Sequence, residues 1–221
     1  MFIGHFAVAL GSKKIAPTLS LGTLVLSAQL VDLLWPLFLL LDIEHARIDP
    51  GNTAMTPLDF YDYPFTHSLI GAMGWSLVMG IGYFVFRREL RNALVVGFCV
   101  FSHWVLDFIT HRPDLPLGFD GMVFFGLGLW NSFAVSLIVE LGLFMLGLWF
   151  YLKTTGTKTN FGFYGFWFFI ALLIGIHLAN VFGPPPPSIE MVAIAGNSLW
   201  LLVLMAYWVD KNRMLRKSVR L

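Results

Sequence analysis

The sequence has little charge for its length and only one cysteine. Asp, Glu, Lys and Arg make up 12% of its 221 residues, whereas soluble domains carry about 25%. The net charge of +1 provides no basic surface for nucleic acid, so we expect no nucleic-acid partner. A single cysteine, Cys99, excludes a disulfide within the chain. The sequence is therefore neither a typical soluble domain nor a disulfide-stabilised scaffold.

Long apolar runs dominate instead. Hydrophobic residues make up 57% of the chain, and six runs approach the ~20 residues that an α-helix needs to cross the hydrocarbon core. The sequence therefore predicts an all-α, polytopic membrane helix bundle in a single domain. We expect six transmembrane helices, at residues 18–41, 64–86, 92–110, 131–152, 162–182 and 189–209. Residues 1–12 are too short to span and predict a half-inserted or re-entrant helix.

Basic and acidic segments alternate between these runs. All but two of the 14 Lys and Arg residues lie on one side, in residues 13–14, 87–91, 153–158 and 211–220. The opposite connections hold Arg47, Arg112 and seven acidic residues. The positive-inside rule places the basic segments in the cytoplasm. We expect a multi-pass protein of a bacterial inner (plasma) membrane with a cytoplasmic C-terminus.

Four ionisable residues lie in or at the ends of three apolar runs: Asp32, His67, His103 and Asp107. A charge at bilayer depth costs roughly 2.5–3.5 kcal/mol on insertion scales, so such residues usually pair, line a cavity or bind a ligand. From the helical rise, Asp32 lies roughly 14 Å and His103 roughly 10 Å below the outer end of its run, and the other two lie within roughly 5 Å. Shared depth and ligand chemistry predict a site for zinc or a similar divalent metal.

The metal site has further candidate ligands. His103, Asp107 and His111 recur every four residues and therefore share one helical stripe. His5 joins them if its short helix folds towards the outer half of the membrane. Pro36 is expected to break the first span and thereby to bring Asp32 closer to the other predicted ligands. Asp42 opens an acidic cluster that ends at His45, and it remains an alternative to Asp32. The predicted metal ligands are His5, Asp32, His67, His103, Asp107 and His111.

Three residues bear on catalysis. Asp107 is the candidate for positioning a water molecule. Glu140, near the middle of the fourth span, is a candidate proton-transfer group. His177 stands alone on an aromatic span and is expected to be a structural histidine of the bundle.

Short motifs in the first 120 residues resemble the membrane-bound metal-dependent hydrolases of the YdjM type. The matching stretches are Gly4-His5, Ala28-Gln29-Leu30-Val31-Asp32, Phe65-Thr66-His67-Ser68-Leu69 and Ser102-His103-Trp104-Val105-Leu106-Asp107. That family is distantly similar to zinc-dependent phospholipase C, which uses an early His, an Asp, a His and a His-x-x-x-Asp pair around a metal cluster. The resemblance implies that Asp32, His67, His103 and Asp107 ligate one metal, with His5 and His111 near neighbouring metals. The later His-x-x-x-Glu of the phospholipases has no match here.

These features predict a metal-dependent hydrolase of a phosphoester at the extracytoplasmic face, with membrane lipids as partners and a lipid headgroup as one candidate substrate. Residues 1–120 would form the metal-site half, residues 121–210 additional helices and residues 211–221 a basic cytoplasmic tail.

Two other functions stay open. One is a non-enzymatic membrane subunit with a structural metal or a polar core. The other is a proton-coupled transporter, although the chain shows no internal repeat of the kind common in transporters.

Overall fold

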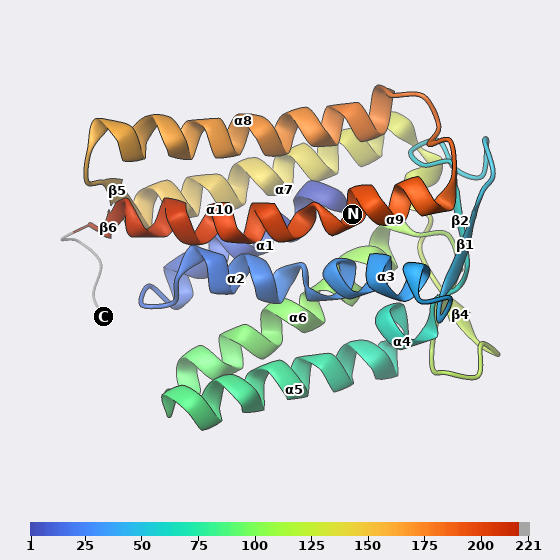
Figure 1. The fold of residues 1–221 in the computed structure, drawn as a ribbon, viewed down its shortest axis with the longest axis horizontal. Coiled ribbons are helices and arrows are strands. Elements are labelled where there is room, and N and C mark those ends of the chain that lie inside the picture. The colour runs from blue at the N-terminus through green and yellow to red at the C-terminus, as the bar shows by residue number, and fades with distance from the viewer. Residues whose placement is uncertain (217–221) are drawn as a thin grey trace.

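The computed structural model describes residues 1–216. Most helices run along one long axis, and short antiparallel strand pairs lie at both ends of the bundle (Figure 1). The helices are α1 (Phe2–Ile15), α2 (Leu21–Ala28), α3 (Leu30–Leu40), α4 (Pro64–His67), α5 (Leu69–Arg87), α6 (Leu90–Thr110), α7 (Phe133–Thr154), α8 (Asn160–Phe182), α9 (Ile189–Asn197) and α10 (Leu199–Lys211), with a 3-10 turn η1 (Leu129–Asn131). The antiparallel strand pairs are β1 (His45–Ile48) with β2 (Leu58–Asp62), β3 (Leu115–Pro116) with β4 (Phe124–Phe125), and β5 (Thr155–Thr157) with β6 (Arg213–Leu215).

The helices have the length and surface of a membrane protein. Within residues 1–216, five helical stretches are long and apolar enough to cross a membrane, namely α5, α6, α7, α8 and the pair α9–α10, and the bent pair α2–α3 makes a sixth. Large apolar side chains such as Phe86, Ile138 and Tyr164 point outwards, as expected of a surface that faces lipid. The all-α, multi-span prediction is confirmed. The identity of the membrane and the side of the C-terminus stay predictions, and residues 217–221 of the predicted tail lie outside the described residues.

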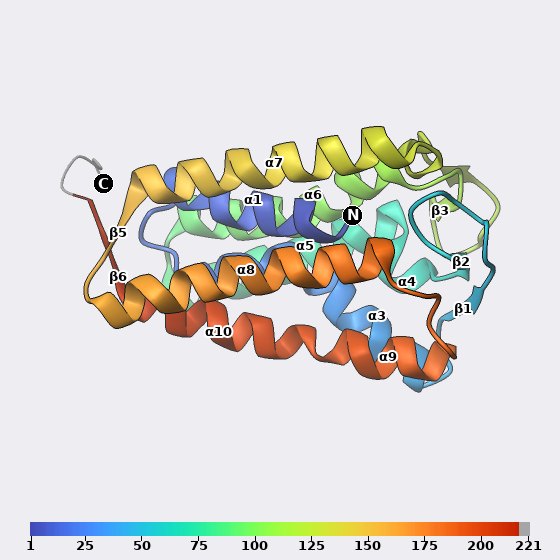
Figure 2. The ribbon, with the colours of Figure 1, turned by 90° about the horizontal axis from the view of Figure 1, so that it is seen from above.

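The short helix α1 belongs to the core of the bundle. It packs against α7, α2 and α6 (Figure 2), and Ile3, Phe6 and Leu10 are fully buried. A Cβ atom at Gly147 of α7 would lie 2.3 Å from the carbonyl oxygen of Ala7, so glycine at this position lets the two helices approach closely. Because α1 is enclosed, it carries His5 into the interior.

The first predicted span is broken, but not at Pro36. Helices α2 and α3 meet at Gln29 with a bend of 54°. Pro36 lies inside α3, and its ring is packed so closely on α9 that a Cβ atom at Gly196 would lie 2.6 Å from Pro36 Cγ. Membrane helices tolerate proline where neighbouring groups compensate for the lost hydrogen bond. The break therefore lies just before Asp32 and places this residue in the first turn of α3.

Candidate metal centre

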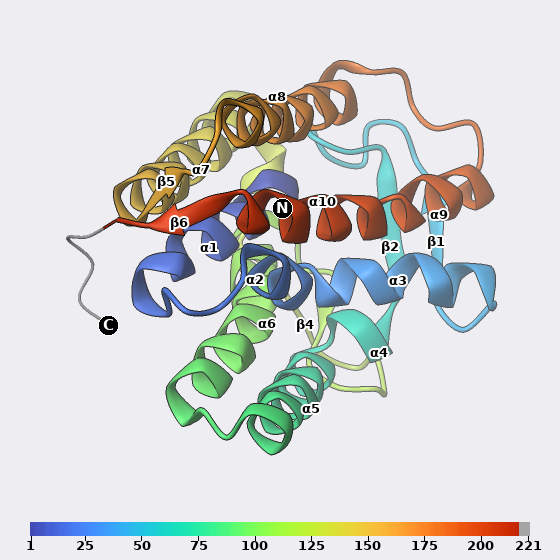
Figure 3. The same ribbon diagram turned by 60° about the vertical axis from the view of Figure 1, so that its left-hand side comes forward.

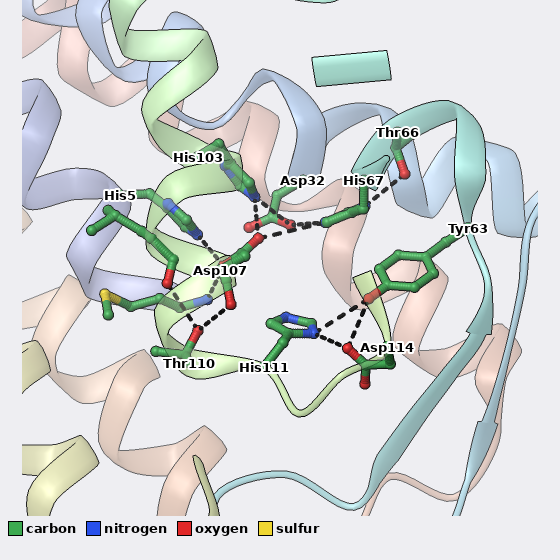
Figure 4. A network of polar contacts seen from close by, with 12 residues as sticks. His5, Asp32, Tyr63, Thr66, His67, His103, Asp107, Thr110, His111 and Asp114 are labelled. Carbon is green, nitrogen blue, oxygen red and sulfur yellow. Dashed lines mark hydrogen bonds and ion pairs between the residues drawn. The ribbon is translucent and has the colours of Figure 1, made fainter. Parts of the chain in front are cut away.

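Four of the predicted ligands come together inside the bundle, near its β1–β2 end (Figure 4). The Nε2 atom of His103 lies 3.2 Å from Oδ2 of Asp107 and 3.5 Å from Oδ1 of Asp32. The Nε2 atom of His67 lies 3.5 Å from the same Asp32 oxygen and 4.0 Å from Asp107 Oδ2. Helices α3, α4 and α6 thus bring two imidazoles and two carboxylates together, and Asp32, His67 and His103 form one group of three possible ligands.

This spacing fits a metal ion. Ligand atoms at ~2.1 Å from a tetrahedral zinc ion are about 3.4 Å from one another, and the four nitrogen–oxygen distances lie between 3.2 and 4.0 Å. The Nε2 atom of His103 is buried and has no hydrogen-bond partner among residues 1–216. A buried nitrogen that faces two carboxylates without a hydrogen bond is suited to a cation. Metal binding itself stays a prediction.

A backbone carbonyl orients the ring of His103. The Nδ1 atom lies 2.9 Å from the carbonyl oxygen of Ala28 and donates its proton to it. Ala28 is the last residue of α2, where the carbonyls lack partners within the helix. Because Nδ1 carries the proton, the lone pair of Nε2 points towards the carboxylates, as a metal ligand requires. The helix break at Gln29 therefore contributes directly to the site.

A buried chain of hydrogen bonds orients His67. The hydroxyl of Thr66 donates to Oε2 of Glu44 at 2.6 Å, so it accepts from Nδ1 of His67 at 2.7 Å. Glu44 also accepts from the backbone nitrogen of Thr66 at 2.8 Å. Burial raises the pKa of the Glu44 carboxyl above its ordinary value, although the hydrogen bonds from Thr66 act in the opposite direction. The sequence analysis did not single out Glu44 and missed this role; a hydroxyl directly before His67 was the available signal.

The alternative prediction, that Asp42 takes the place of Asp32 as a ligand, is wrong. Its side chain is 92% exposed and lies 3.1 Å from Nε2 of His45, whose Nδ1 lies 2.7 Å from Asp62. The hydrogen bond that His45 donates to the carboxylate of Asp62 is the main cause that raises the pKa of His45. These three residues form a solvent-facing cluster at the β1–β2 hairpin, because Asp42 follows the end of α3 and points away from the bundle.

His5 lies on the other side of Asp107. Its ring stacks on the ring of His103 with centroids 3.6 Å apart, and its Nε2 lies 3.2 Å from Asp107 Oδ1. The amino group of Met1 lies 2.7 Å from the same oxygen. Neither ring nitrogen of His5 has a hydrogen-bond partner in the described part of the chain. His5, His103 and Asp107 therefore form a second group of possible ligands, which shares His103 with the group of Asp32, His67 and His103.

His111 is not brought into either group of possible ligands within residues 1–216. Its Nδ1 lies 3.0 Å from Asp114 and 3.4 Å from the hydroxyl of Tyr63, and its ring packs on Trp130 with centroids 4.3 Å apart. Burial raises the pKa of Tyr63 well above its ordinary value, so its hydroxyl stays protonated. His111 lies one helical turn beyond Asp107, at the point where α6 has ended, and this turns its ring away from the four ligands.

A second polar pair lines the cavity beside the metal centre. Glu140 of α7 and His177 of α8 are each 2% exposed, and Oε2 of Glu140 lies 3.9 Å from Nδ1 of His177. Trp130 donates to Oε1 of Glu140 at 3.4 Å. Oε2 of Glu140 and Nε2 of His177 are without hydrogen-bond partners among the described residues. Both residues line a cavity of about 760 Å³ that also contacts Asp32, His67 and Asp107.

His177 is buried in the bundle as expected, but its Nε2 atom has no hydrogen-bond partner among the described residues. His177 lies five residues before the end of α8, which places it roughly 8 Å below that end, at the depth of the predicted ligands. The shared depth that grouped Asp32, His67, His103 and Asp107 in the sequence would also have included His177.

Comparisons of the chain with family models, curated proteins and solved structures gave no match. The resemblance to YdjM-type hydrolases rests on the short motifs, and the geometry above carries the argument for function.

Proposed function

We propose that this chain is a membrane-embedded, metal-dependent hydrolase of a phosphoester, with its active site at the extracytoplasmic face of a bacterial inner membrane. One observation carries the proposal. Each of two imidazole Nε2 atoms lies 3.2–4.0 Å from an oxygen of each of two carboxylates, and Nε2 of His103 has no hydrogen-bond partner among the described residues. A mixed set of nitrogen and oxygen ligands favours zinc among the common divalent metals.

In this proposal Asp32, His67, His103 and Asp107 hold the ion. When bound, the metal would polarise a phosphoryl oxygen and lower the pKa of water to about 7. Asp107 acts as a ligand rather than as a base, since Oδ1 faces His5 and Oδ2 faces His103. The network of Glu44 and Thr66 keeps the ring of His67 in place.

Glu140 and His177 are the groups available for proton transfer. Hydrolysis forms a bond between a water oxygen and phosphorus and breaks the ester P–O bond, while the leaving alcohol oxygen gains a proton. In the proposed step Oε2 of Glu140 accepts the proton from water, and the imidazolium form of His177 donates a proton to the leaving oxygen. Transfer of a proton from Glu140 to His177, whose Nδ1 atom lies 3.9 Å from Oε2, then restores both groups. General acid–base catalysis of this kind contributes about 10²–10⁴-fold to a rate.

Metal content and turnover, measured on the same purified samples, test the proposal. We expect about one or two equivalents of zinc or manganese in the wild-type protein and hydrolysis of at least one member of a panel of phospholipids and phosphomonoesters. His103→Gln should lose both. His45→Gln is the matched control, because His45 lies on the exposed hairpin and should keep both.

Each other outcome favours a different function. A wild-type protein that takes up no metal, even after incubation with zinc, would overturn the metal centre and favour a polar transport path. A protein that binds metal but hydrolyses nothing in the panel would favour a non-enzymatic subunit with a structural metal.

A further inference from the structure

The cavity beside the metal centre has both polar and apolar lining. Its ionisable lining residues include Asp32, His67, Asp107, Glu140 and His177. The cavity is bordered by α3, α8 and the α9–α10 pair, and also by residues 50–60 of the β1–β2 hairpin and the proline-rich stretch 183–188. The apolar lining includes Trp35, Ile176, Val181, Val192, Leu199 and Leu202. A volume of about 760 Å³ lies within the ~300–1,000 Å³ of ordinary small-molecule sites.

The cavity is closed on one side and open on another. Pro36 of α3 and Gly196 of α9 are in close contact and seal the α3 side. Helix α8 packs against α10 but diverges from α9, and the chain between them is the proline-rich stretch 183–188 (Figure 3). Ala179 of α8 and Ala195 of α9 are exposed and line the cavity at this opening. Two small side chains, one on each helix, therefore line the cavity where the two helices part.

The helices that border this opening expose large apolar side chains. Phe182 on α8, Ile194 on α9 and Leu201 on α10 are exposed, although the exposed Asn180 of the cavity lining is polar. Both helix segments belong to stretches long enough to cross a membrane. An opening of this kind faces hydrocarbon rather than water. A water-soluble phosphoester would gain nothing from such a route.

We propose that the opening between α8 and α9 is a lateral entrance for the substrate, which is a phosphate-bearing membrane lipid. Its headgroup phosphate reaches the metal centre, and one hydrocarbon chain lies along Ile176, Val192 and Leu199. This inference rests on the proposed function and names its substrate class. The apolar walls keep the chain in surroundings like those of the bilayer, so that the headgroup moves inwards without drawing its chain into water.

A photoreactive lipid tests the entrance without requiring turnover. The protein is reconstituted in phosphatidylcholine vesicles that contain phosphatidylglycerol with a diazirine in the middle of one acyl chain. After illumination, peptide mass spectrometry maps the adducts. We expect adducts on cavity-lining positions of α8 and α9 as well as on the outer surface. Adducts confined to outer residues such as Phe168 and Leu204 would overturn the entrance.

Two matched substitutions on α8 sharpen the test. Ala179→Trp places an indole in the opening and should reduce the cavity adducts on the order of tenfold. Ala171→Trp places the same side chain on an exposed position of α8 that does not line the cavity, and it should leave the adducts unchanged. Ala195→Trp repeats the test from the opposite wall if Ala179→Trp does not fold. Equal adduct yields in all variants would contradict the proposal.

Turnover separates this inference from the proposed function. Ala179→Trp should slow hydrolysis of the vesicle lipid about tenfold more than hydrolysis of p-nitrophenyl phosphate. An equal effect on both substrates would overturn the entrance and leave the hydrolase proposal standing. Cavity adducts in a metal-loaded protein that hydrolyses neither substrate would overturn the hydrolase and support the lipid site.

Discussion

Replacing Thr66 by valine removes one hydroxyl and preserves the shape of the side chain. That hydroxyl lies 2.6 Å from Oε2 of Glu44 and 2.7 Å from Nδ1 of His67, and Thr66 is completely buried. The substitution removes no proposed ligand. We expect it to release the ring of His67 from its fixed orientation and thereby to weaken metal binding.

The size of the effect follows from these contacts. Loss of a hydrogen-bond partner behind a metal-binding histidine weakens metal affinity by about 10–100-fold, which corresponds to about 1.4–2.7 kcal/mol of binding free energy. The N–H group of His67 is left buried without an acceptor, and such a group costs about 1–3 kcal/mol of folding stability. Glu44 keeps its bond from the backbone nitrogen of Thr66 and is affected less.

Competition with a chromogenic zinc chelator measures the affinity in detergent solution. Thr66→Ser retains the hydroxyl and should bind zinc within about threefold of the wild-type protein. Thr154→Val is the matched control, because Thr154 is also buried but donates to the carbonyl of Phe150 in its own helix, far from the site. Unchanged zinc affinity in Thr66→Val would refute the orienting role, and an equal loss in Thr154→Val would show that the effect is unspecific.

Three further predictions concern catalysis, stability and topology. His177→Gln should reduce turnover by about 10²-fold or more while the metal content stays constant, because His177 lies against Glu140 and outside the groups of possible ligands in the described chain. Loss of metal from this variant would contradict the prediction. Removal of the metal should lower the thermal unfolding midpoint, since a ligand that binds only the folded state contributes about 2.7 kcal/mol at 100 times its Kd; an unchanged midpoint in calorimetry argues against a bound metal. A cysteine introduced at Asn52 should react with an impermeant maleimide in intact cells, and one introduced at Gly156 should not. Background labelling should be low because the native Cys99 is buried, and labelling at Gly156 would reverse the predicted orientation.

Much of the fold follows from the lengths of the apolar runs. The predicted spans 92–110, 162–182 and 189–209 correspond closely to Leu90–Thr110, Asn160–Phe182 and Ile189–Lys211. The meeting of Asp32, His67, His103 and Asp107 follows from two regularities, the constant rise of a helix and the four-residue spacing on α6. These regularities are local, and they are therefore readable from the sequence.

The parts that sequence reasoning missed depend on contacts between distant residues. Thr66 and Glu44 are 22 residues apart, and the β1–β2 hairpin brings them together. His177 and Glu140 come from two separate helices, so each looks isolated in its own span. Likewise, hydropathy predicts a single transmembrane helix at residues 18–41, because the residues on either side of Gln29 are as apolar as those of an unbroken helix.

The break at Gln29 and the metal centre are two aspects of one arrangement. In a continuous helix the carbonyl of Ala28 would accept the N–H group of Asp32, and Nδ1 of His103 would lose the acceptor that orients its ring. His67 likewise ends α4 immediately before the interruption at Ser68, and a third interruption at Ser198 lies on the cavity wall. In a bilayer, interrupted helices are tolerated where their free backbone groups are buried in protein or line a polar cavity. The interruption at Gln29 therefore provides the acceptor that orients His103, and the ring of His103 in turn satisfies a backbone carbonyl that the interruption leaves free.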